Sequence, residues 1–422
     1  MSKDTINTVT SCCDDFDPES LFPDQARARI QDLLKPVTGT ESCPLRDSLN
    51  RVLSEDIVSG IDVPSGTNSA MDGYAVHAAD LPESGTRTLK LVGTSFAGKP
   101  YNGPVNRSEC VRIMTGALLP DGTDTVVIQE RVEREGDDIR IGADTRAGDN
   151  VRNAGEDIAR GETVLHKGIC LTAADLGLIA SLGIPSVQVT RRLRVAFFST
   201  GDELRSIGEP LEDGAIYDSN RYTLYGMLQR LNVEIIDLGV VRDTVAATEQ
   251  AFHEAADAAD VIITSGGVSV GEADYIKDVL QDIGKVDFWK VAMKPGRPLT
   301  FGTVGDAWFF GLPGNPVSVM VTFYQFVQPA LRYLMGQHEC EPVTVSVPCL
   351  SSLKKRPGRV EYQRGVLARD DSGRMAVRKT GAQGSGILTS MSRANCFIVL
   401  SIDSEGAAPG DVVDVQPFYG IV

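Results

Sequence analysis

Between residues 194 and 335, apolar strand-like runs alternate with amphipathic helical segments. The runs LRVAFFS, VEIIDLG and VIITS precede helical patterns at residues 220–231, at 243–258 and from about residue 275. Because parallel strands are joined by crossovers that are usually helices, this order predicts a parallel sheet with helices on both faces. FWKVA, PLTF and AWFFG are three further predicted strands, and a last helix is predicted at residues 317–334.

The segments on either side have a different texture. Residues 61–153 contain short β-type runs separated by turns such as FAGKP and YNGPV, which predicts an inserted all-β domain. Helical patterns at 17–34 and 171–182 flank it, with a short helix leading into a strand at 45–57. We therefore expect a multidomain α/β protein with a doubly wound α/β domain, a discontinuous helical domain and two β domains. The expected boundaries are 17–60 with 154–190 (helical), 61–153 (inserted β), 191–338 (α/β) and 339–422 (C-terminal β).

The chain is acidic, with a net charge of −16, which opposes binding to nucleic acid or to an anionic membrane. No apolar run approaches the roughly 18 residues that span a bilayer. The N-terminal stretch carries acids and no apolar core, so we expect a flexible lead and not a secretory signal. Cys12 and Cys13 lie in this lead. The eight cysteines form no CxxC pair and the four histidines show no ligand spacing, which favours a cytoplasmic protein with reduced thiols and without zinc.

Polar loops follow four of the predicted strands. In an open parallel sheet, ligands bind beyond the carboxyl ends of the strands, so these loops are expected to share one rim. They are Thr200, Gly201, Asp202 and Glu203; Val241, Arg242 and Asp243; SGGVSVGEAD at residues 265–274; and LPGNP at residues 312–316.

The loop at residues 265–274 has the composition of an anion site. Gly266 and Gly267 let backbone N–H groups approach a ligand closely, and the helix that follows offers a positive N-terminus. A plain strand-to-helix turn is the alternative. The polar run of Ser265, Ser269, Glu272 and Asp274 favours a functional loop, because a turn needs none of these side chains.

Carboxylates and cations also gather on the expected rim. Glu203, Asp243 and Asp274 beside a phosphate site indicate Mg²⁺, which prefers oxygen ligands. The alternative for each acid is a helix N-cap, and it is strongest for Asp243. KVAMKPGRPLT places Lys294 and Arg297, with Lys290, in a loop stiffened by prolines, and this supplies positive charge in an acidic protein. A solvated basic face is the alternative.

Two further motifs admit a structural and a functional interpretation. LPGNPVS has a good N-cap residue in Asn315 and a proline, Pro316, at a tolerated helical position, although its place on the rim also suits ligand shaping. In the β insertion, TNSAMDGYA, RIMTGA and AGEDI place Asp72, Thr115 and Asp157 at turns. Turn chemistry explains these residues as well as a binding role does.

Together the motifs carry a family resemblance. NSAMDGYAV, SFAGKPY, RIMTGA, GEDI, ASLGI, FSTGDEL, IYDSNR, VVRD, SGGVSVGEADY, KPGRP, GLPGNPVS and GSG occur in order between about residues 45 and 400. They resemble the MoeA family of molybdopterin molybdenumtransferases, and they are similar to the E domain of gephyrin and to the plant molybdenum insertase. Two positions depart from the family pattern: Thr67 stands where Asp is usual, and Arg297 where Lys is usual.

The resemblance implies an enzyme that inserts molybdate into adenylylated molybdopterin with release of AMP and with help from Mg²⁺. It implies a MogA-like α/β domain and a homodimer whose clefts are built from both subunits, with the adenylyltransferase of the same pathway as a possible partner. Family functional positions correspond to Asp72, Thr115, Asp157, Glu203, Asp243, Asp274, Pro313 and Pro316. Glu203 and Asp274 resemble the metal-side acids, and the residues that resemble nucleotide or substrate contacts are Thr200, Gly201, Asp218, Asn220, Ser265, Gly266, Gly267 and Ser269. Lys294, Arg297, Arg359 and Ser385 resemble contacts to molybdate.

Two other functions remain open at this point. The α/β domain also resembles the adenylyltransferase that precedes the insertion step, although the additional domains argue against that activity. A scaffold role, as gephyrin has, is disfavoured because the chain lacks gephyrin's additional N-terminal domain and long linker.

Overall fold

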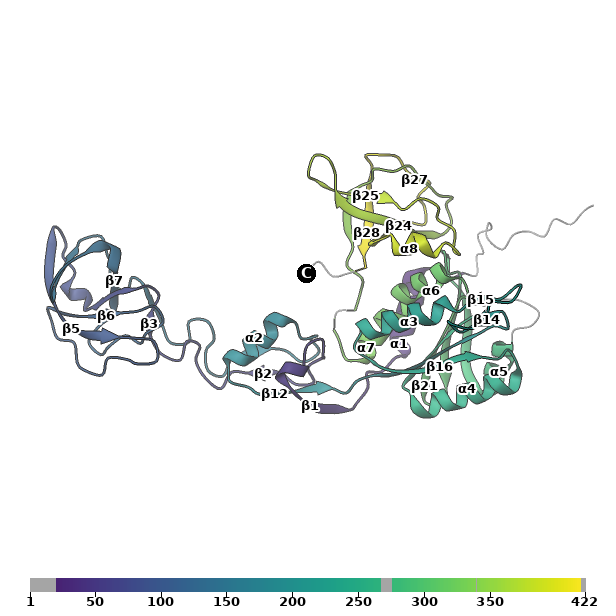
Figure 1. Cartoon of the computed structure of the whole chain (residues 1–422), viewed down its shortest axis with the longest axis horizontal. Helices are drawn as coiled ribbons and strands as arrows, with labels where there is room; N and C mark the ends of the chain where they lie inside the picture. Colours follow the sequence, from purple (N-terminus) through teal and green to yellow (C-terminus); the bar gives the residue numbers. More distant parts are fainter. Residues whose placement is uncertain (1–19, 267–274, 339, 419–422) are drawn as a thin grey trace, which may run out of the picture. The chain divides into compact units, whose positions relative to one another are not determined.

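The computed structural model describes residues 20–266, 275–338 and 340–418 (Figure 1). Within these residues the chain forms two compact units. The smaller unit comprises residues 42–49 and 53–189, and the larger unit comprises residues 20–41, 50–52 and the described residues from 190 onward. The four predicted domain boundaries stay predictions, because each unit combines parts of more than one predicted domain.

The centre of the larger unit is a six-stranded sheet with the order β16-β13-β17-β21-β20-β18. Its strands are β13 (Arg194–Thr200), β16 (Glu234–Val241), β17 (Val261–Ser265), β18 (Gly284–Lys290), β20 (Pro298–Val304) and β21 (Ala307–Leu312). The first four strands in this order are parallel, whereas β20 and β18 are antiparallel to their neighbours. The expectation of a wholly parallel sheet is therefore wrong at one edge. No helix lies between β18 and β21 in the chain, and without a crossover the strands can return only in the antiparallel direction.

Helices cover both faces of this sheet, which confirms the doubly wound arrangement (Figure 1). Successive residues of β13 face opposite sides. Phe197 belongs to the core with Leu228 of α3 (Ser219–Arg230), and Phe198 belongs to the core with Phe252 of α4 (Val245–Ala258). The helices are α1 (Pro23–Leu33), α3 (Ser219–Arg230), α4 (Val245–Ala258), α5 (Tyr275–Ile283), α6 (Pro316–Thr322) and α7 (Gln328–Leu334). The α4 helix is capped by Thr244, whose side chain accepts from the backbone N–H of Ala247.

The last predicted helix differs from the expectation of one continuous element. A π-helical turn at Phe323–Val327 separates α6 from α7. Pro329 lies in the first turn of α7, where it has no backbone N–H to donate and its ring crowds the preceding turn. The first helix is also shorter than the predicted range 17–34. It begins at Pro23 and ends at Leu33.

A second sheet of the larger unit contains the C-terminal strands and has the order β19-β24-β26-β28-β22, with β25 paired to β24. These strands are β22 (Val345–Pro348), β24 (Val360–Arg369), β25 (Met375–Lys379), β26 (Cys396–Leu400) and β28 (Val412–Pro417). Its first member, β19 (Met293–Lys294), comes from the segment predicted to belong to the α/β domain. The short strands β23 (Leu353–Lys354) and β27 (Gly406–Ala407) pair beside it, and α8 (Leu388–Ser392) precedes β26.

The smaller unit confirms the all-β character of residues 61–153. Its main sheet has the order β7-β4-β6-β5-β9-β8. The strands are β4 (Gly73–Val76), β5 (Thr86–Ser95), β6 (Glu109–Ile113), β7 (Thr125–Ile128), β8 (Val132–Glu135) and β9 (Asp138–Gly142). A separate core surrounds α2 (Ala173–Ser181), whose predicted cap, Thr172, accepts from the N–H of Asp175. The helix predicted to start at residue 45 is only one 3-10 turn, Leu45–Asp47.

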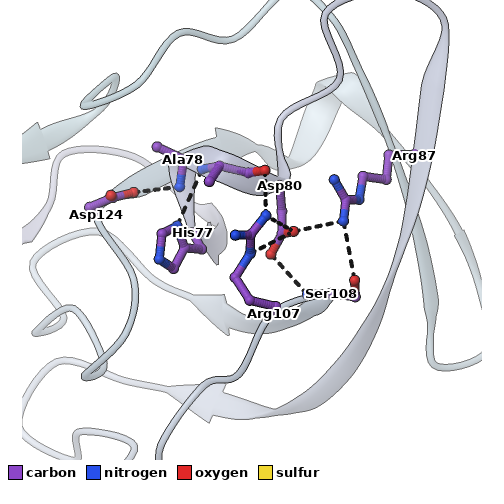
Figure 2. A network of polar contacts seen from close by, with 8 residues as sticks. His77, Ala78, Asp80, Arg87, Arg107, Ser108 and Asp124 are labelled. Atoms are coloured by element: carbon purple, nitrogen blue, oxygen red, sulfur yellow. Dashed lines mark hydrogen bonds and ion pairs between the residues drawn. The ribbon is translucent and has the colours of Figure 1, made fainter.

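A buried carboxylate ties the turns of this β sheet together (Figure 2). Asp80 is fully buried, and its oxygens lie 2.8 Å from Arg87 and 2.9 Å from Arg107. The backbone N–H of Ser108 donates to the same carboxylate at 2.8 Å. Burial by itself would raise the pKa of Asp80, but the hydrogen bonds from Arg107 and Ser108 and the two positive charges hold it below its usual value. This network is structural, because it links the turn at Ala78–Asp80 to the loop before β6.

No helix in the described part of the chain is long and apolar enough to cross a membrane.

Candidate functional site

The carboxyl ends of β13, β17 and β21 lie side by side, as the strand-end argument requires. Asn220, in the first turn of α3, connects two of these ends. Its Nδ2 donates to Oγ of Ser265 at 2.8 Å and to the carbonyl of Gly314 at 2.7 Å. Ser265 ends β17, and Gly314 belongs to the LPGNP loop after β21. Two loops far apart in sequence are thus held in one place by a single amide.

Gly266 begins the predicted anion loop in a conformation that only glycine adopts readily. Its φ is +93°, and a Cβ at this position would lie 2.7 Å from the carbonyl oxygen of Thr200. Its N–H donates to the carbonyl of Leu312 at 3.1 Å, so the loop starts pressed between the ends of β13 and β21. Gly267, Ser269 and Asp274 lie outside the described residues, so their predicted roles stay predictions.

Two buried acceptor atoms at the start of α3 have no hydrogen-bond partner in the described part of the chain. Asp218, 2% exposed, caps α3 by accepting from the N–H of Arg221, and its Oδ2 has no hydrogen-bond partner among the described residues. Oδ1 of Asn220 is also buried and also has no hydrogen-bond partner among the described residues. A buried acceptor left unsatisfied costs about 1–3 kcal/mol, so such atoms indicate a donor supplied by solvent or ligand. Asp218 and Asn220 lie at the start of a helix and not in a loop after a predicted strand. The family motif IYDSNR is therefore the only sequence feature that identifies them.

The acids of the rim influence one another. Burial, with the negative charges of Asp202 and Glu203, raises the pKa of Asp243. Since Thr244 caps α4, the helix-cap alternative for Asp243 is wrong. Oxygen ligands of this kind suit Mg²⁺ chemically. Within residues 20–266, 275–338 and 340–418, however, no group of three or more His, Cys, Asp or Glu side chains is arranged to hold a metal ion.

The helix α6 supports three other motifs. Gly314 in the loop before it would bring a Cβ within 3.9 Å of Cα of Gly266. The N–H of Val317, in its first turn, donates to the carbonyl of Ser385 at 3.0 Å. At its side, a Cβ on Gly296 would lie 2.6 Å from Oγ1 of Thr322, so the KPGRP loop packs directly on the helix. Gly266 and the motifs LPGNP, KPGRP and GSG therefore meet around α6.

The prolines of the LPGNP motif lie in the loop after β21 and in the first turn of α6. Pro316 occupies the first turn of α6, and Pro313 and Gly314 form the loop before it. Asn315 takes the N-cap position as predicted, but among the described residues its side chain makes no capping hydrogen bond. The motif therefore shapes the rim and starts the helix at the same time.

The predicted anion-binding cations are brought together by strand pairing. In β19, Lys294 pairs with Glu361 of β24, and Nζ of Lys294 lies 3.8 Å from Oε1 of Glu361. Arg359 immediately precedes Val360, which pairs with Met293. The carbonyl of Arg297 accepts from the N–H of Val291 at 2.7 Å, which closes the KPGRP loop.

A buried arginine that the sequence did not reveal supports the GSG loop. Arg364, 1% exposed, donates through Nε to Oγ of Ser390 and through Nη2 to the carbonyl of Gly384, both at 3.0 Å. Burial lowers its pKa to about 10, against the opposing effect of the negative charge of Glu361. It thereby fixes Gly384, the residue next to Ser385. No pattern in the sequence distinguishes Arg364, because its strand, VEYQRGVLAR, holds several other polar and charged residues.

In the smaller unit, the structure brings Asp72 and Thr115 together. Oδ1 of Asp72 accepts from both the N–H and Oγ1 of Thr115, each at 2.7 Å. These two hydrogen bonds lower the pKa of Asp72, so its carboxylate is held in the charged form. Asp157 pairs with another partner, since its N–H donates to the carbonyl of Val63 at 3.0 Å.

Comparison with known proteins accounts for nearly the whole chain. Residues 22–183 match the model "MoeA N-terminal region (domain I and II)", residues 196–333 "Probable molybdopterin binding domain", and residues 346–418 "MoeA C-terminal region (domain IV)". A molybdopterin molybdenumtransferase of Haemophilus influenzae is 46% identical over 397 residues, which cover 94% of this chain and 98% of the relative. The chain belongs to the MoeA family.

Other relatives agree with this membership. A molybdopterin molybdenumtransferase of Nostoc is 36% identical, covering 89% of this chain and 88% of the relative. Gephyrin of Dictyostelium discoideum is 35% identical, over 85% of this chain but only 57% of that protein. The crystal structure of the MoeA protein of Pyrococcus horikoshii matches with a TM-score of 0.83 and 30% identity, covering 94% of this chain and all of the other. The predicted multidomain α/β fold of a MoeA protein is confirmed.

Proposed function

We propose that this MoeA protein is a molybdopterin molybdenumtransferase that inserts molybdate into adenylylated molybdopterin with release of AMP. The observation that carries the proposal is the convergence on α6 of an oxyanion-type loop at Gly266 and of the basic KPGRP loop. A reaction that joins an adenylylated pterin to a metal oxyanion needs both kinds of site side by side. The Haemophilus relative, aligned over almost its entire length, bears the name of this activity.

The residues on the rim receive roles on this proposal. Asp218, Asn220 and the backbone around Ser265 and Gly266 hold the nucleotide and pyrophosphate, since buried acceptors and a glycine turn suit sugar hydroxyls and phosphate. The remaining members of this set are Thr200, Gly201, Gly267, Ser269, Pro313 and Pro316. They form or shape the loops that surround the phosphates.

The positive residues receive molybdate. Lys294, Arg297 and Arg359 offer charge, and Ser385 offers a hydroxyl, to a dianion that must approach electron-rich dithiolene sulfurs. Without such donors the two negative partners would repel each other, so preorganised cations lower the barrier to their meeting. An oxygen of molybdate attacks the phosphorus of the adenylate, and the P–O bond to the phosphate of the pterin breaks. AMP then leaves with that oxygen as a dithiolene sulfur forms its bond to molybdenum. If a water placed with molybdate attacks instead, the same P–O bond breaks and AMP leaves directly with the oxygen of that water.

Magnesium is part of the proposal. Glu203, Asp243 and Asp274 would hold the ion, and oxygen donors of this kind fit it chemically. When bound, Mg²⁺ would neutralise phosphate charge. The chain's own residues orient the adenylate and hold the oxyanion against it.

The experiment that tests the activity uses the full chain, adenylylated molybdopterin, molybdate and Mg²⁺. We expect AMP release that depends on molybdate, with molybdenum retained on the pterin. In Asp274→Asn, turnover should fall far more than pterin binding, and equal loss of both would remove the metal role of this acid. If ATP were consumed to adenylylate free molybdopterin instead, the preceding adenylyltransferase activity would replace the proposed one.

The assembly and location belong to the same proposal. We infer a homodimer in the cytoplasm, in which Asp72, Thr115 and Asp157 of one subunit complete the cleft of the other, with the adenylyltransferase as a partner that supplies substrate. Sedimentation of the purified protein at several concentrations tests the dimer.

A further inference from the structure

Glu361 is a buried carboxylate placed directly against one of the candidate oxyanion residues. Its side chain is 10% exposed, whereas that of Lys294 is 53% exposed. The parallel pairing of β19 with β24 puts the two residues opposite each other, with Nζ and Oε1 3.8 Å apart. The carboxylate of Glu361 therefore pairs with the ammonium group of Lys294, the same group that an incoming oxyanion would need to bind.

The surroundings of Glu361 keep its charge supported independently of Lys294. Nε2 of Gln363, which is 3% exposed, donates to Oε1 of Glu361 at 3.1 Å and to the carbonyl of Lys354 at 3.2 Å. The negative charge of Glu361 also favours the charged forms of Lys355 and Arg364. A buried charge without partners is costly. Because Gln363, Lys355 and Arg364 stabilise the carboxylate of Glu361, Lys294 can move away without leaving that charge unpaired.

The two side chains differ in their freedom to move. Lys294 has a half-exposed, flexible stem, so its ammonium can turn toward a ligand at small cost. Glu361 is fixed by burial and by Gln363, which is itself held by the backbone of β23. Lys294 is therefore the member of the pair that changes partner.

We propose that Glu361 is a positioning residue that acts as an internal counter-ion, occupying Lys294 until an oxyanion displaces it. This inference rests on the proposed function, because it takes Lys294 as a ligand of molybdate. Glu361 makes every oxyanion compete for the ammonium. An oxyanion held only by Lys294 binds weakly, whereas one that also reaches Arg297, Arg359 and Ser385 binds well. The carboxylate thus favours ligands that fill the whole site.

The test measures the equilibrium dissociation constant of molybdate by calorimetry with the full-length protein, and repeats it with sulfate. Glu361→Gln keeps the shape and the acceptor oxygen but removes the competing charge. We expect it to bind molybdate about two- to fivefold more tightly, the range that a partly exposed ion pair supports. Sulfate binding should tighten by a larger factor, because sulfate depends more on Lys294 alone, so the ratio of the two dissociation constants should fall. Asp371→Asn, which removes an exposed charge from the turn between β24 and β25, should change neither constant.

A double-mutant cycle separates this effect from a structural one. Lys294→Gln alone should weaken molybdate binding about tenfold, the loss of one charge-assisted contact. Adding Glu361→Gln to it should then give no gain, because the competed ammonium is gone. A general loss of negative charge, or a repacked strand, would give the same gain in both backgrounds and would overturn the proposal.

Glu361→Asp covers the case in which the glutamine variant fails to fold. It keeps the buried charge that Arg364 and Lys355 need, but withdraws the carboxylate from Lys294 by one methylene. Tighter molybdate binding by this variant supports the proposal, and unchanged or weaker binding in both Glu361 variants overturns it. If instead Lys294→Gln leaves molybdate binding unchanged, the assignment of Lys294 in the proposed function is what fails.

Discussion

Nδ2 of Asn220 lies 2.8 Å from Oγ of Ser265, and the same nitrogen reaches the carbonyl of Gly314. One side chain at the start of α3 therefore joins the end of β17 to the loop that precedes α6. Ser265 starts the candidate phosphate loop. Gly314 precedes α6, the helix on which the candidate molybdate loop packs. The relative placement of the two sites consequently depends on this one side chain.

Asn220→Ala should lower both stability and affinity for the adenylylated pterin. Two hydrogen bonds of about 0.5–1.5 kcal/mol each disappear, so we expect a loss of about 1–3 kcal/mol in the free energy of unfolding, measured by urea denaturation. Gln229→Ala removes an exposed amide from the same helix and is the control. If both variants lost stability equally, Asn220 would not be a link between the loops.

Gly266→Ala tests the close approach of the anion loop to β13. The new Cβ would meet the carbonyl of Thr200 at 2.7 Å while the backbone keeps a φ of +93°. Gly214 has a φ of +85° with nothing within 4 Å of a Cβ, so Gly214→Ala carries the backbone cost of about 1 kcal/mol alone. We expect a visibly larger drop in thermal midpoint for Gly266→Ala. Equal drops would show that the contact with Thr200 relaxes freely.

The stability of the larger unit should depend on pH through Asp260. Burial of this carboxylate would raise its pKa, but hydrogen bonds from Arg191 and Arg194 outweigh it and lower the pKa to about 2, from 3.8. Because the folded-state pKa is depressed, the stabilisation is present above about pH 4 and is lost as the pH falls through 2. It amounts to about 2 kcal/mol.

Asp260→Asn is the variant that checks this pH dependence. It should be less stable than the parent at neutral pH, and it should lose less stability between about pH 4 and 2. Denaturant titrations at several pH values measure both quantities. Parallel curves for the two proteins would contradict the assignment.

A mixed-subunit experiment tests the shared cleft. In the proposed dimer, each cleft takes Asp72 from one subunit and Asp274 from the other. Asp72→Asn and Asp274→Asn homodimers should both be nearly inactive. Refolding them together should restore about one quarter of the activity, because half of the dimers are mixed and each holds one intact cleft. No recovery despite exchange of subunits would mean that each cleft uses one chain.

Several features of the candidate site could be predicted from the sequence because they depend on local order. Polar loops after the strands ending at Thr200, Ser265 and Leu312 meet on one rim, since parallel strands bring their carboxyl ends together. For Gly266 the sequence predicted a close approach of the backbone to a ligand, and the structure adds a close approach to the carbonyl of Thr200. Asp218 and Asn220 were identified only by family resemblance, since their importance lies in buried atoms that no local pattern reveals.

The sequence alone determined the alternation of strands and helices, the insertion of a β region, and the motifs that identify the family. Each of these features depends on residues that lie close together in the chain. Tertiary structure decided the rest. It reversed one strand of the sheet, β20, which makes the pairings β18–β20 and β20–β21 antiparallel. It also gave the cap of α4 to Thr244, left Asp243 among other acids, and set Glu361 against Lys294. These outcomes depend on contacts between residues far apart in the chain. A partner 67 positions away, like that of Lys294, is chosen by how the strands pair and not by the neighbours of either residue.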